Sequence, residues 1–511
     1  MSAETSSVRY DRPPPRPAAP TGQNRYAIAA WIFLRLLAVV HLVAFGSFWV
    51  QLEGLVGVHG LAPASHYFEA IHRQLGASAY LQLPSLCWIF GAGKFLHVLC
   101  AGGVVLSLLL FLGIAPAVCS LLLWAGYLSI CAAGQLFFGF QWDSLLLETT
   151  LLAVFIAPWS WRPLWRLHES PPLARLLAGW LLFRLMFLAG VVKLASGDSA
   201  WRDLSALTFH FETQPLPTPL GWLAHQAPAA WHRASCAGMF VLELFIPFFL
   251  FAPRPLRHNA ALLLAAFMGA VALTGNYTYF NLLTIALCLL CLDDRWWTHV
   301  LRLLPARLFA VGDASRYQPA EPSRIQRITV TVFVVFAVGY TLPQALAGTV
   351  RGWPAPPGFA TIVRFVAPFR SFNNYGLFAV MTRPRPELIF EGSQDGRDWR
   401  AYEFRHKPGD LRRAPTWVAP HQPRLDWQLW FAALDSPQRN PWVLALCEHL
   451  LRGTPAVLGL LGENPFPEGP PRHIRVVRYE YHFTDTGTHT QTGQWWRRSP
   501  LDVYVPPATL R

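Results

Sequence analysis

Several ionisable side chains lie within or beside long apolar stretches of this sequence, where a charge is costly unless it has a partner or a water-filled cavity. Arg184 and Lys193 share one stretch, while Glu148 and Glu243 lie in two others. From their depth in these stretches, we expect Arg184 to meet Glu243, and Lys193 to meet Glu148 or Asp143. Such buried pairs would fix the register of neighbouring helices. The whole polar cluster comprises Asp143, Glu148, Arg184, Lys193, His210, Glu212 and Glu243.

The same cluster supports an alternative, a cavity that opens outward and is lined by Lys193, Glu148, Asp143 and His210. In a membrane-embedded enzyme, Lys193 would act there as a general base with His210 and Glu212 nearby. The sequence adds little to this hypothesis, because it contains no GxSxG, HExxH, GxxxxGK[ST] or GxGxxG motif.

Cysteine spacing gives no stronger sign of a reactive centre. Cys288 and Cys291 form a CxxC, but the pair lies in the apolar run LLTIALCLLCL, where packing is the usual role of a cysteine. We therefore predict no catalytic residue, no cofactor and no metal.

Composition identifies the surroundings of these residues. Hydrophobic residues make up 53% of the 511 and charged residues only 14%, whereas soluble domains carry roughly 25% charged residues. This is the composition of an integral membrane protein embedded in a lipid bilayer. The net charge of +13 does not indicate a nucleic-acid partner, because no basic segment is interleaved with stacking aromatics on a soluble platform.

Nine apolar runs have a length that could span a bilayer. We expect a polytopic α-helical membrane domain over residues 26–350, preceded by a disordered cytoplasmic segment at 1–25. The runs lie near residues 26–50, 90–112, 115–134, 144–160, 176–195, 235–252, 259–275, 278–292 and 327–349.

The distribution of arginine predicts the orientation. With the N-terminus in the cytoplasm and nine spans, the inner segments carry fifteen Arg, whereas the outer segments carry only Arg73, Arg202 and Arg233. Positive charge favours the cytoplasmic side. The C-terminal part, residues 353–511, is thereby placed outside the cytoplasm.

Residues 353–511 have the pattern of a soluble, β-rich domain with inserted helices. Alternation of apolar and polar residues predicts strands, and helical spacing predicts the inserted helices. The predicted strands are 375–381, 387–392, 399–404 and 474–483, and the predicted helices are 424–434 and 441–451.

Aromatic and arginine residues of this domain are candidates for binding a partner, since both types are enriched at binding hot spots. The competing interpretation is that most of these tryptophans form the core of a small domain. For adjacent Trp495 and Trp496, one sheet face cannot bury both. The candidates are Arg424, Asp426, Trp427, Trp430, Phe431, Trp495, Trp496, Arg497 and Arg498.

A collinear set of segments from about residue 135 to 505 resembles the lipase maturation factor family. In the membrane part the similar segments are QWDSLLLE at 141–148 and the run 179–247, which contains GWLLFRLMFLAGVVKL, WRDL, HFETQPLPTP and ELFIPFFLF. In the C-terminal part they are NNYGLF at 373–378, KPGD at 407–410, RLDWQLWFAAL at 424–434, NPF at 464–466, PPRHIR at 470–475 and GQWWRR at 493–498.

The resemblance implies a multi-pass membrane protein that assists the folding or assembly of exported lipases or related secreted proteins, without known catalytic residues. It implies the inner membrane in a bacterium and the endoplasmic reticulum membrane in a eukaryote. The multi-span part alone is also similar to the membrane portion of vitamin K-dependent carboxylases, which keeps the enzyme alternative open. A second alternative is a membrane scaffold that binds a partner through its C-terminal domain.

Overall fold

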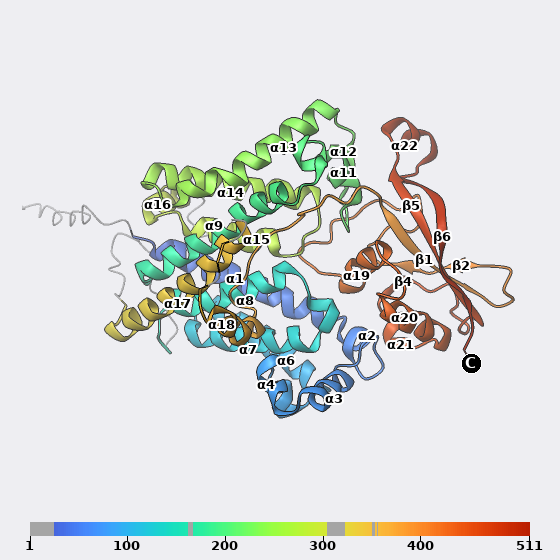
Figure 1. Cartoon of the computed structure of the whole chain (residues 1–511), viewed down its shortest axis with the longest axis horizontal. Helices are drawn as coiled ribbons and strands as arrows, with labels where there is room; N and C mark the ends of the chain where they lie inside the picture. The colour runs from blue at the N-terminus through green and yellow to red at the C-terminus, as the bar shows by residue number, and fades with distance from the viewer. Residues whose placement is uncertain (1–24, 162–166, 304–321, 350–352, 355, 511) are drawn as a thin grey trace, which may run out of the picture.

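The computed structural model describes residues 25–161, 167–303, 322–349, 353–354 and 356–510. Long helices fill one side of the molecule, and the strands β1, β5 and β6 form the opposite end, where the C-terminus lies (Figure 1). The predicted N-terminal segment 1–25 lies outside the described residues, apart from Arg25.

Each of the nine predicted apolar runs contains a helix. Within the described residues, seven helices are long and apolar enough to cross a membrane, whereas α8 and α15 are shorter. The seven are α1 (Ala27–Trp49), α6 (Phe95–Leu112), α7 (Pro116–Ala133), α9 (Pro172–Ala195), α13 with the following 3-10 turn (Ala229–Phe251), α14 (Arg254–Thr274) and α17 (Arg324–Thr349). The two shorter ones are α8 (Gln141–Ile156) and α15 (Phe280–Leu290).

Local sequence explains where these helices begin and end. Helix α6 stops at Gly113, whose left-handed φ of 78° is cheap only for glycine. Helix α7 then starts with Pro116 at its first turn, where a missing N–H costs nothing. The tight connection makes α6 and α7 neighbours, and α7 packs in turn on α8.

Short helices connect the long ones. The chain between α9 and α13 contains α11 (Ala206–Thr213) and α12 (Pro219–His225). Both lie on the side of the molecule that carries the sheet (Figure 1). The remaining short helices are α2 (Leu52–Val56), α3 (Ala64–Leu75), α4 (Ala79–Gln82), α5 (Cys87–Phe90), η2 (Gln135–Phe138), α10 (Ser199–Arg202), α16 (Asp294–Arg302), α18 (Phe359–Val366) and η5 (Ala367–Phe369).

The C-terminal part contains a four-stranded antiparallel sheet of order β2-β1-β5-β6, with β3 and β4 paired beside it. Helix α19 (Arg424–Ala433) packs on β1, and α20 (Pro441–Arg452) packs on β5. The strands are β1 (Pro386–Ser393), β2 (Arg400–Ala401), β3 (Glu403–Phe404), β4 (Leu461–Glu463), β5 (His473–Phe483) and β6 (Trp496–Ala508), and the short helices are α21 (Pro455–Leu458) and α22 (Thr486–Thr492).

Most of the predicted strands and both predicted helices of this part are confirmed, with two exceptions. The predicted strand at 375–381 is wrong, because this segment is irregular and bonds to Glu148 of α8 and to Asp198 instead of a neighbouring strand. Strand β6 was missed, since Pro500, Pro506 and Pro507 interrupt its alternation and proline donates no ladder hydrogen bond.

Candidate functional site

Arg424 joins the two parts of the chain through a buried ion pair. It opens α19, is 1% exposed, and faces Asp143 in the first turn of α8. Its guanidinium donates to both carboxylate oxygens of Asp143, at 2.9 and 3.2 Å, and to the carbonyl of Phe137 at 2.5 Å. The guanidinium carbon also lies 3.3 Å from the centre of the Phe138 ring. This two-pronged geometry is the strongest form of an arginine–carboxylate contact.

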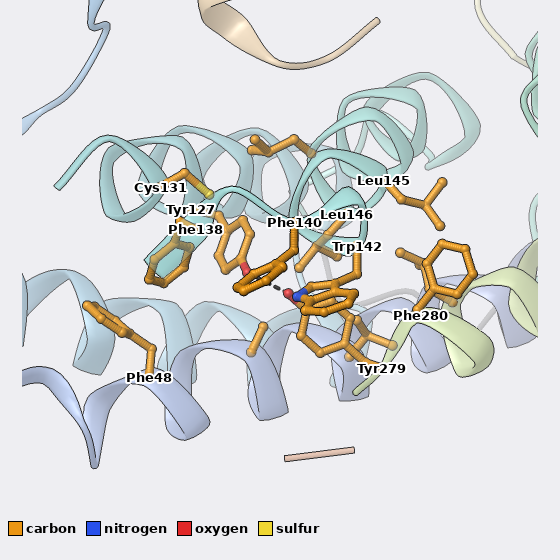
Figure 2. Packing of buried hydrophobic residues seen from close by; sticks show 14 of the residues in the cluster. Phe48, Tyr127, Cys131, Phe138, Phe140, Trp142, Leu145, Leu146, Tyr279 and Phe280 are labelled. Carbon is orange, nitrogen blue, oxygen red and sulfur yellow. Dashed lines mark hydrogen bonds between the residues drawn. The ribbon is translucent and has the colours of Figure 1, made fainter. Parts of the chain in front are cut away.

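Aromatic side chains enclose Asp143 from the opposite side. The hydroxyl of Tyr127 donates to its carboxylate at 2.5 Å, and the hydroxyl of Tyr279 lies 3.1 Å from the same oxygen. Figure 2 shows these two tyrosines among the rings of Phe48, Phe138 and other residues of the helical core. Asp143 is 0% exposed, so its charge is offset by Arg424 and by these hydroxyls instead of by water.

Electrostatics keep Arg424 ionised in this position. Burial disfavours the charged guanidinium, but Asp143 and its hydrogen bonds outweigh burial and raise the pKa of Arg424 above its usual value. Arg424 therefore stays charged at every physiological pH. Asp426, in the same helical turn as Arg424, accepts the backbone N–H groups of His406 and Lys407 at 2.8 and 2.9 Å.

Gln422, two residues before Arg424, extends this contact to α1 and α8. Its side-chain oxygen accepts from the Trp142 indole at 2.8 Å, and its backbone N–H donates to the Ser47 hydroxyl at 2.9 Å. Gln51 donates to the Gln422 carbonyl at 2.7 Å and accepts the Arg424 backbone N–H at 2.9 Å. The segment before α19 is thus fixed by buried hydrogen bonds to two helices of the membrane part.

The imidazole of His421 gives this contact a dependence on pH. Its Nδ1 lies 2.9 Å from the Ser47 hydroxyl, and burial lowers the pKa of His421 to about 4. Because an unfolded histidine titrates near 6.5, the unfolded chain binds more protons between these values. We expect stability to be fully present above about pH 6.5 and to fall as the pH drops toward 4.

Thermal unfolding of the full chain in detergent at pH 7, 6, 5 and 4.5 measures this effect. His421→Gln keeps a hydrogen-bonding group but cannot be protonated, so its stability should change less over this range. Exposed His66 provides the control His66→Gln, which should follow the unsubstituted chain. Equal pH profiles for both variants would contradict a role for His421.

Glu148 forms a second polar contact between the two parts. Its carboxylate pairs with Arg184 of α9 and accepts from the Tyr375 hydroxyl at 2.7 Å and from the Asn373 backbone N–H at 3.1 Å. Arg184 also donates to the Asn373 carbonyl at 2.7 Å. The NNYGLF segment is therefore attached to the long helices by the carboxylate–guanidinium pair.

This irregular segment lies deep among the helices. Glu148 and Arg184 lie near the middles of α8 and α9, and Ser371 accepts from the indole of Trp124, which lies near the middle of α7. Half of α7 corresponds to a depth of about 13 Å at 1.5 Å per residue. Irregular backbone is tolerated at such depth only where protein groups satisfy its hydrogen bonds, as Glu148 and Arg184 do here.

Lys193 belongs to a third buried pair. Its ammonium donates to both Glu243 oxygens at 2.8 Å and lies 5.5 Å from the Trp201 ring centre. The pairings predicted from depth are wrong, since Lys193 pairs with Glu243 and Arg184 pairs with Glu148. The predicted cavity is not formed as described either, because Asp143, Glu148 and Lys193 belong to three separate ion pairs.

The outer-loop candidates also hold the C-terminal sheet. Glu212 of α11 contacts His482 of β5 at 2.8 Å and accepts the Phe483 backbone N–H at 3.1 Å. Fully buried Arg385 donates to the carbonyls of Glu212 and Gln214, and pairs with Glu387 at 2.9 Å. This sheet is thereby joined to the loop between α9 and α13.

Among the described residues, His210 forms no hydrogen bond or ion pair with Glu212 or Arg385. It lies 3.4 Å from the Tyr277 hydroxyl, and burial, assisted by the Lys193 charge, lowers the pKa of His210 to about 4. Its imidazole is therefore neutral at pH 7. Within the described residues no group of three or more His, Cys, Asp or Glu is placed to hold a metal ion.

Most of the partner-binding candidates are buried, in line with the competing interpretation that the tryptophans belong to a core. Trp430 donates its indole N–H to the Thr213 carbonyl at 2.9 Å, and Trp496 packs on Phe483. Phe431 is 42% exposed, Trp495 is half-buried, and Arg497 and Arg498 are exposed. The buried candidates are Arg424, Asp426, Trp427, Trp430 and Trp496.

Sequence reasoning missed several residues that hold the two parts together. Asn276 accepts the backbone N–H groups of Val418 and Ala419 at 2.7 and 3.0 Å, and donates to the Thr416 carbonyl at 2.8 Å. Gln422, Asn373 and Arg385 have comparable roles. Asn373 lies in a segment that carried the family resemblance, but neutral amides give no charge pattern by which their partners could be predicted.

These contacts define a class of protein: a multi-pass helical membrane protein whose β-containing C-terminal part is attached to the helices through buried ion pairs and amide hydrogen bonds. Family models described as "Lipase maturation factor transmembrane domain" and "Lipase maturation factor C-terminal domain" match residues 28–299 and 371–506. This chain belongs to the lipase maturation factor family.

Curated relatives match over nearly the whole chain. Lipase maturation factor 2 of Homo sapiens is 36% identical over 94% of this chain and 82% of its own length. Lipase maturation factor 1 of Bos taurus is 34% identical over 99% of this chain and 96% of its own length, and that of Mus musculus is 33% identical over 94% and 87%. No solved structure matches the chain.

Proposed function

We propose that this chain is a membrane-bound maturation factor that assists the folding or assembly of exported lipases or related secreted proteins. The observation that carries the proposal is the match to relatives named lipase maturation factor over 94–99% of the chain. The three ion pairs bear on the alternative of an enzyme, because Asp143, Glu148 and Lys193 of the predicted cavity each have a buried partner. Nothing comparable favours the scaffold alternative.

The proposed topology follows from the arginine distribution. We place the N-terminus in the cytoplasm, nine spans over residues 26–350, and the domain 353–511 in the compartment that exported proteins enter. That compartment is the endoplasmic reticulum lumen in a eukaryote and the periplasmic side of the inner membrane in a bacterium. A client lipase would then meet the C-terminal domain directly after translocation.

The exposed stretch 497–503 of β6 is our candidate for client contact. Strand β6 is the last strand of the four-stranded sheet, and every residue of this stretch is exposed. Leu501 and Val503 are 52% and 57% exposed, and Arg497 and Arg498 begin the stretch. Apolar groups with an arginine rim suit a partially folded client. Pro500 and Asp502 protect the strand against indiscriminate edge pairing.

Co-expression of a secreted lipase with this chain in cells lacking the chain's own gene tests the function. We expect a higher specific activity of secreted lipase than with empty vector, at unchanged lipase transcript. Lys193→Ala leaves Glu243 unpaired, so the folding of this variant has to be checked first. A loss of secreted lipase activity in a folded Lys193→Ala variant would favour an enzyme over a binding factor. Equal secreted lipase activity with and without the chain would contradict the proposal.

Substitution of the candidate client surface gives a sharper prediction. Leu501→Ser with Val503→Ser should lower secreted lipase activity by at least about fivefold, because exposed apolar contacts at a hot spot each contribute about 1 kcal/mol or more. Leu444→Ser is the matched control, because Leu444 is 48% exposed on α20 of the same domain. Equal effects of the surface pair and the control would rule out this surface.

A further inference from the structure

An amphipathic helical segment follows the last long helix and has no buried residue. Helix α18 and the 3-10 turn η5 span Phe359–Phe369, and Ile362, Phe365 and Phe369 are 46%, 58% and 36% exposed. Apolar side chains of this size, exposed in a segment next to a membrane-spanning helix, suit contact with lipid. We therefore expect this face to contact lipid.

A cavity of about 590 Å³ lies beside this segment. Its walls come from the residues after α4, the last turns of α7, and α18 with η5; Leu83, Leu128, Arg364 and Arg370 are among its lining residues. The same end of α7 leads into η2, whose Phe137 carbonyl accepts from Arg424. The cavity consequently lies at the end of α7 that contacts the C-terminal part.

The cavity has two positive charges and no negative one among the described residues that line it. Arg364 forms no hydrogen bond or ion pair with any described residue, and Arg370 donates one bond, at 3.0 Å, to the Phe138 carbonyl. Two guanidiniums at one opening repel each other unless an anion lies between them. Arginine binds phosphate oxygens particularly well, because its planar fork presents two parallel donors.

The lining of the cavity changes from charged side chains to apolar ones. Leu128 lies one helical turn deeper in α7 than Ala132, and both line the cavity together with Leu83. Ala367 and Pro368 add further apolar groups on the side of η5. This gradient matches a ligand with an anionic head and hydrocarbon tails, whereas a free phosphate ion would use only the arginine end.

We propose that this cavity binds the phosphate head of an anionic phospholipid through Arg364 and Arg370, with its acyl chains along α7 and α18. The site is separate from the proposed client surface on β6. It would attach α18 to the bilayer and stabilise the NNYGLF segment, which begins three residues after Arg370.

Binding of phosphatidylglycerol to the purified full chain in detergent tests the proposal, by native mass spectrometry and by the lipid-induced rise in melting temperature. Arg364→Gln with Arg370→Gln should weaken binding at least tenfold. Arg397→Gln with Arg412→Gln removes two exposed arginines of the C-terminal domain and should change it less than twofold. Because Arg370 holds the Phe138 carbonyl, Arg364→Gln alone decides the matter if the double variant does not fold.

Two further measurements identify the ligand. Phosphatidylcholine should bind at least fivefold more weakly than phosphatidylglycerol, and inorganic phosphate at millimolar concentration should not displace the lipid. Equal binding of the two lipids, displacement by phosphate, or equal losses in the arginine and control pairs would each overturn the proposal.

Discussion

Replacing Arg424 with methionine is expected to destabilise the full chain by about 3–5 kcal/mol, because it leaves Asp143 charged, buried and without its cation. Asp143 is 0% exposed, so water does not solvate its charge in the folded chain. The hydroxyls of Tyr127 and Tyr279 still donate to it, but neutral donors do not offset a full charge. The loss should also loosen α19 from the helices, since Arg424 is its first residue.

Thermal unfolding in detergent, followed by tryptophan fluorescence, measures this change. Arg452→Met is the matched control, because the Arg452–Glu448 pair is 60% and 54% exposed and such pairs contribute less than about 1 kcal/mol. The loss of stability in Arg424→Lys should fall between the losses in Arg424→Met and Arg452→Met, since lysine keeps the charge but cannot make the two-pronged contact.

A second substitution separates charge from shape at this position. Asp143→Leu combined with Arg424→Met removes both charges, so we expect it to recover part of the stability lost in the single variant. Recovery should be incomplete, because both tyrosine hydroxyls lose their acceptor. A loss in Arg424→Met no larger than that in Arg452→Met would mean that the ion pair does not hold α19.

The elements of this fold were largely predictable, because they depend on patterns within short segments. The length of the nine apolar runs predicted the helix that each of them contains. Helical spacing predicted α19, which ends one residue before its predicted end. Strand β5 was predicted from period-two alternation, and its observed burial follows that alternation only in part. Strand β6 shows the limit, because its partner β5 holds it in the sheet despite three prolines.

The partners of the buried charges were not predictable in the same way. Depth along a helix places Arg184 and Glu243 at similar heights, but it does not say which helices are neighbours. In the structure α9 contacts both α8 and α13, so Arg184 turns to Glu148 and Lys193 to Glu243. Arg424 is the clearest case, since its partner Asp143 lies 281 residues earlier in the chain. Tertiary packing alone decides such a pairing.

The same limit applies to the predicted partner surface. Trp427 and Trp430 have the residue types of a hot spot, yet the contact they make is with α8 and α11 of their own chain. Hot-spot composition reports burial at an interface, whether that interface is between molecules or within one. The client surface therefore has to be sought among exposed residues of the assembled chain, such as the 497–503 stretch.

Replacing Glu148 with glutamine is expected to release the NNYGLF segment from the helices. Glutamine keeps the size of the side chain and one acceptor, but Arg184, which is 1% exposed, loses its counter-charge. We expect the free energy of unfolding to fall by about 3 kcal/mol. This is the lower end of the range for a broken buried pair, because the Asn373 carbonyl still accepts from Arg184. The effect should be concentrated at the segment, since Asn373 and Tyr375 both bond to this carboxylate.

Cysteine labelling at Ser371 reports the release directly. Ser371 is 1% exposed and adjoins the segment, so Ser371→Cys should react with a small maleimide only when the segment opens. A loss of 3 kcal/mol corresponds to labelling about a hundredfold faster, since 1.4 kcal/mol is a factor of ten. Peptide mass spectrometry separates this cysteine from the eight native ones.

Two comparisons decide whether charge is the cause. Glu448→Gln removes the same group from an exposed pair and should leave the labelling rate unchanged. Glu148→Gln combined with Arg184→Met removes both charges from the deep site and should slow labelling again, because no uncompensated charge remains. If the double variant labels as fast as Glu148→Gln alone, the hydrogen bonds from Asn373 and Tyr375, and not the ion pair, hold this segment at membrane depth.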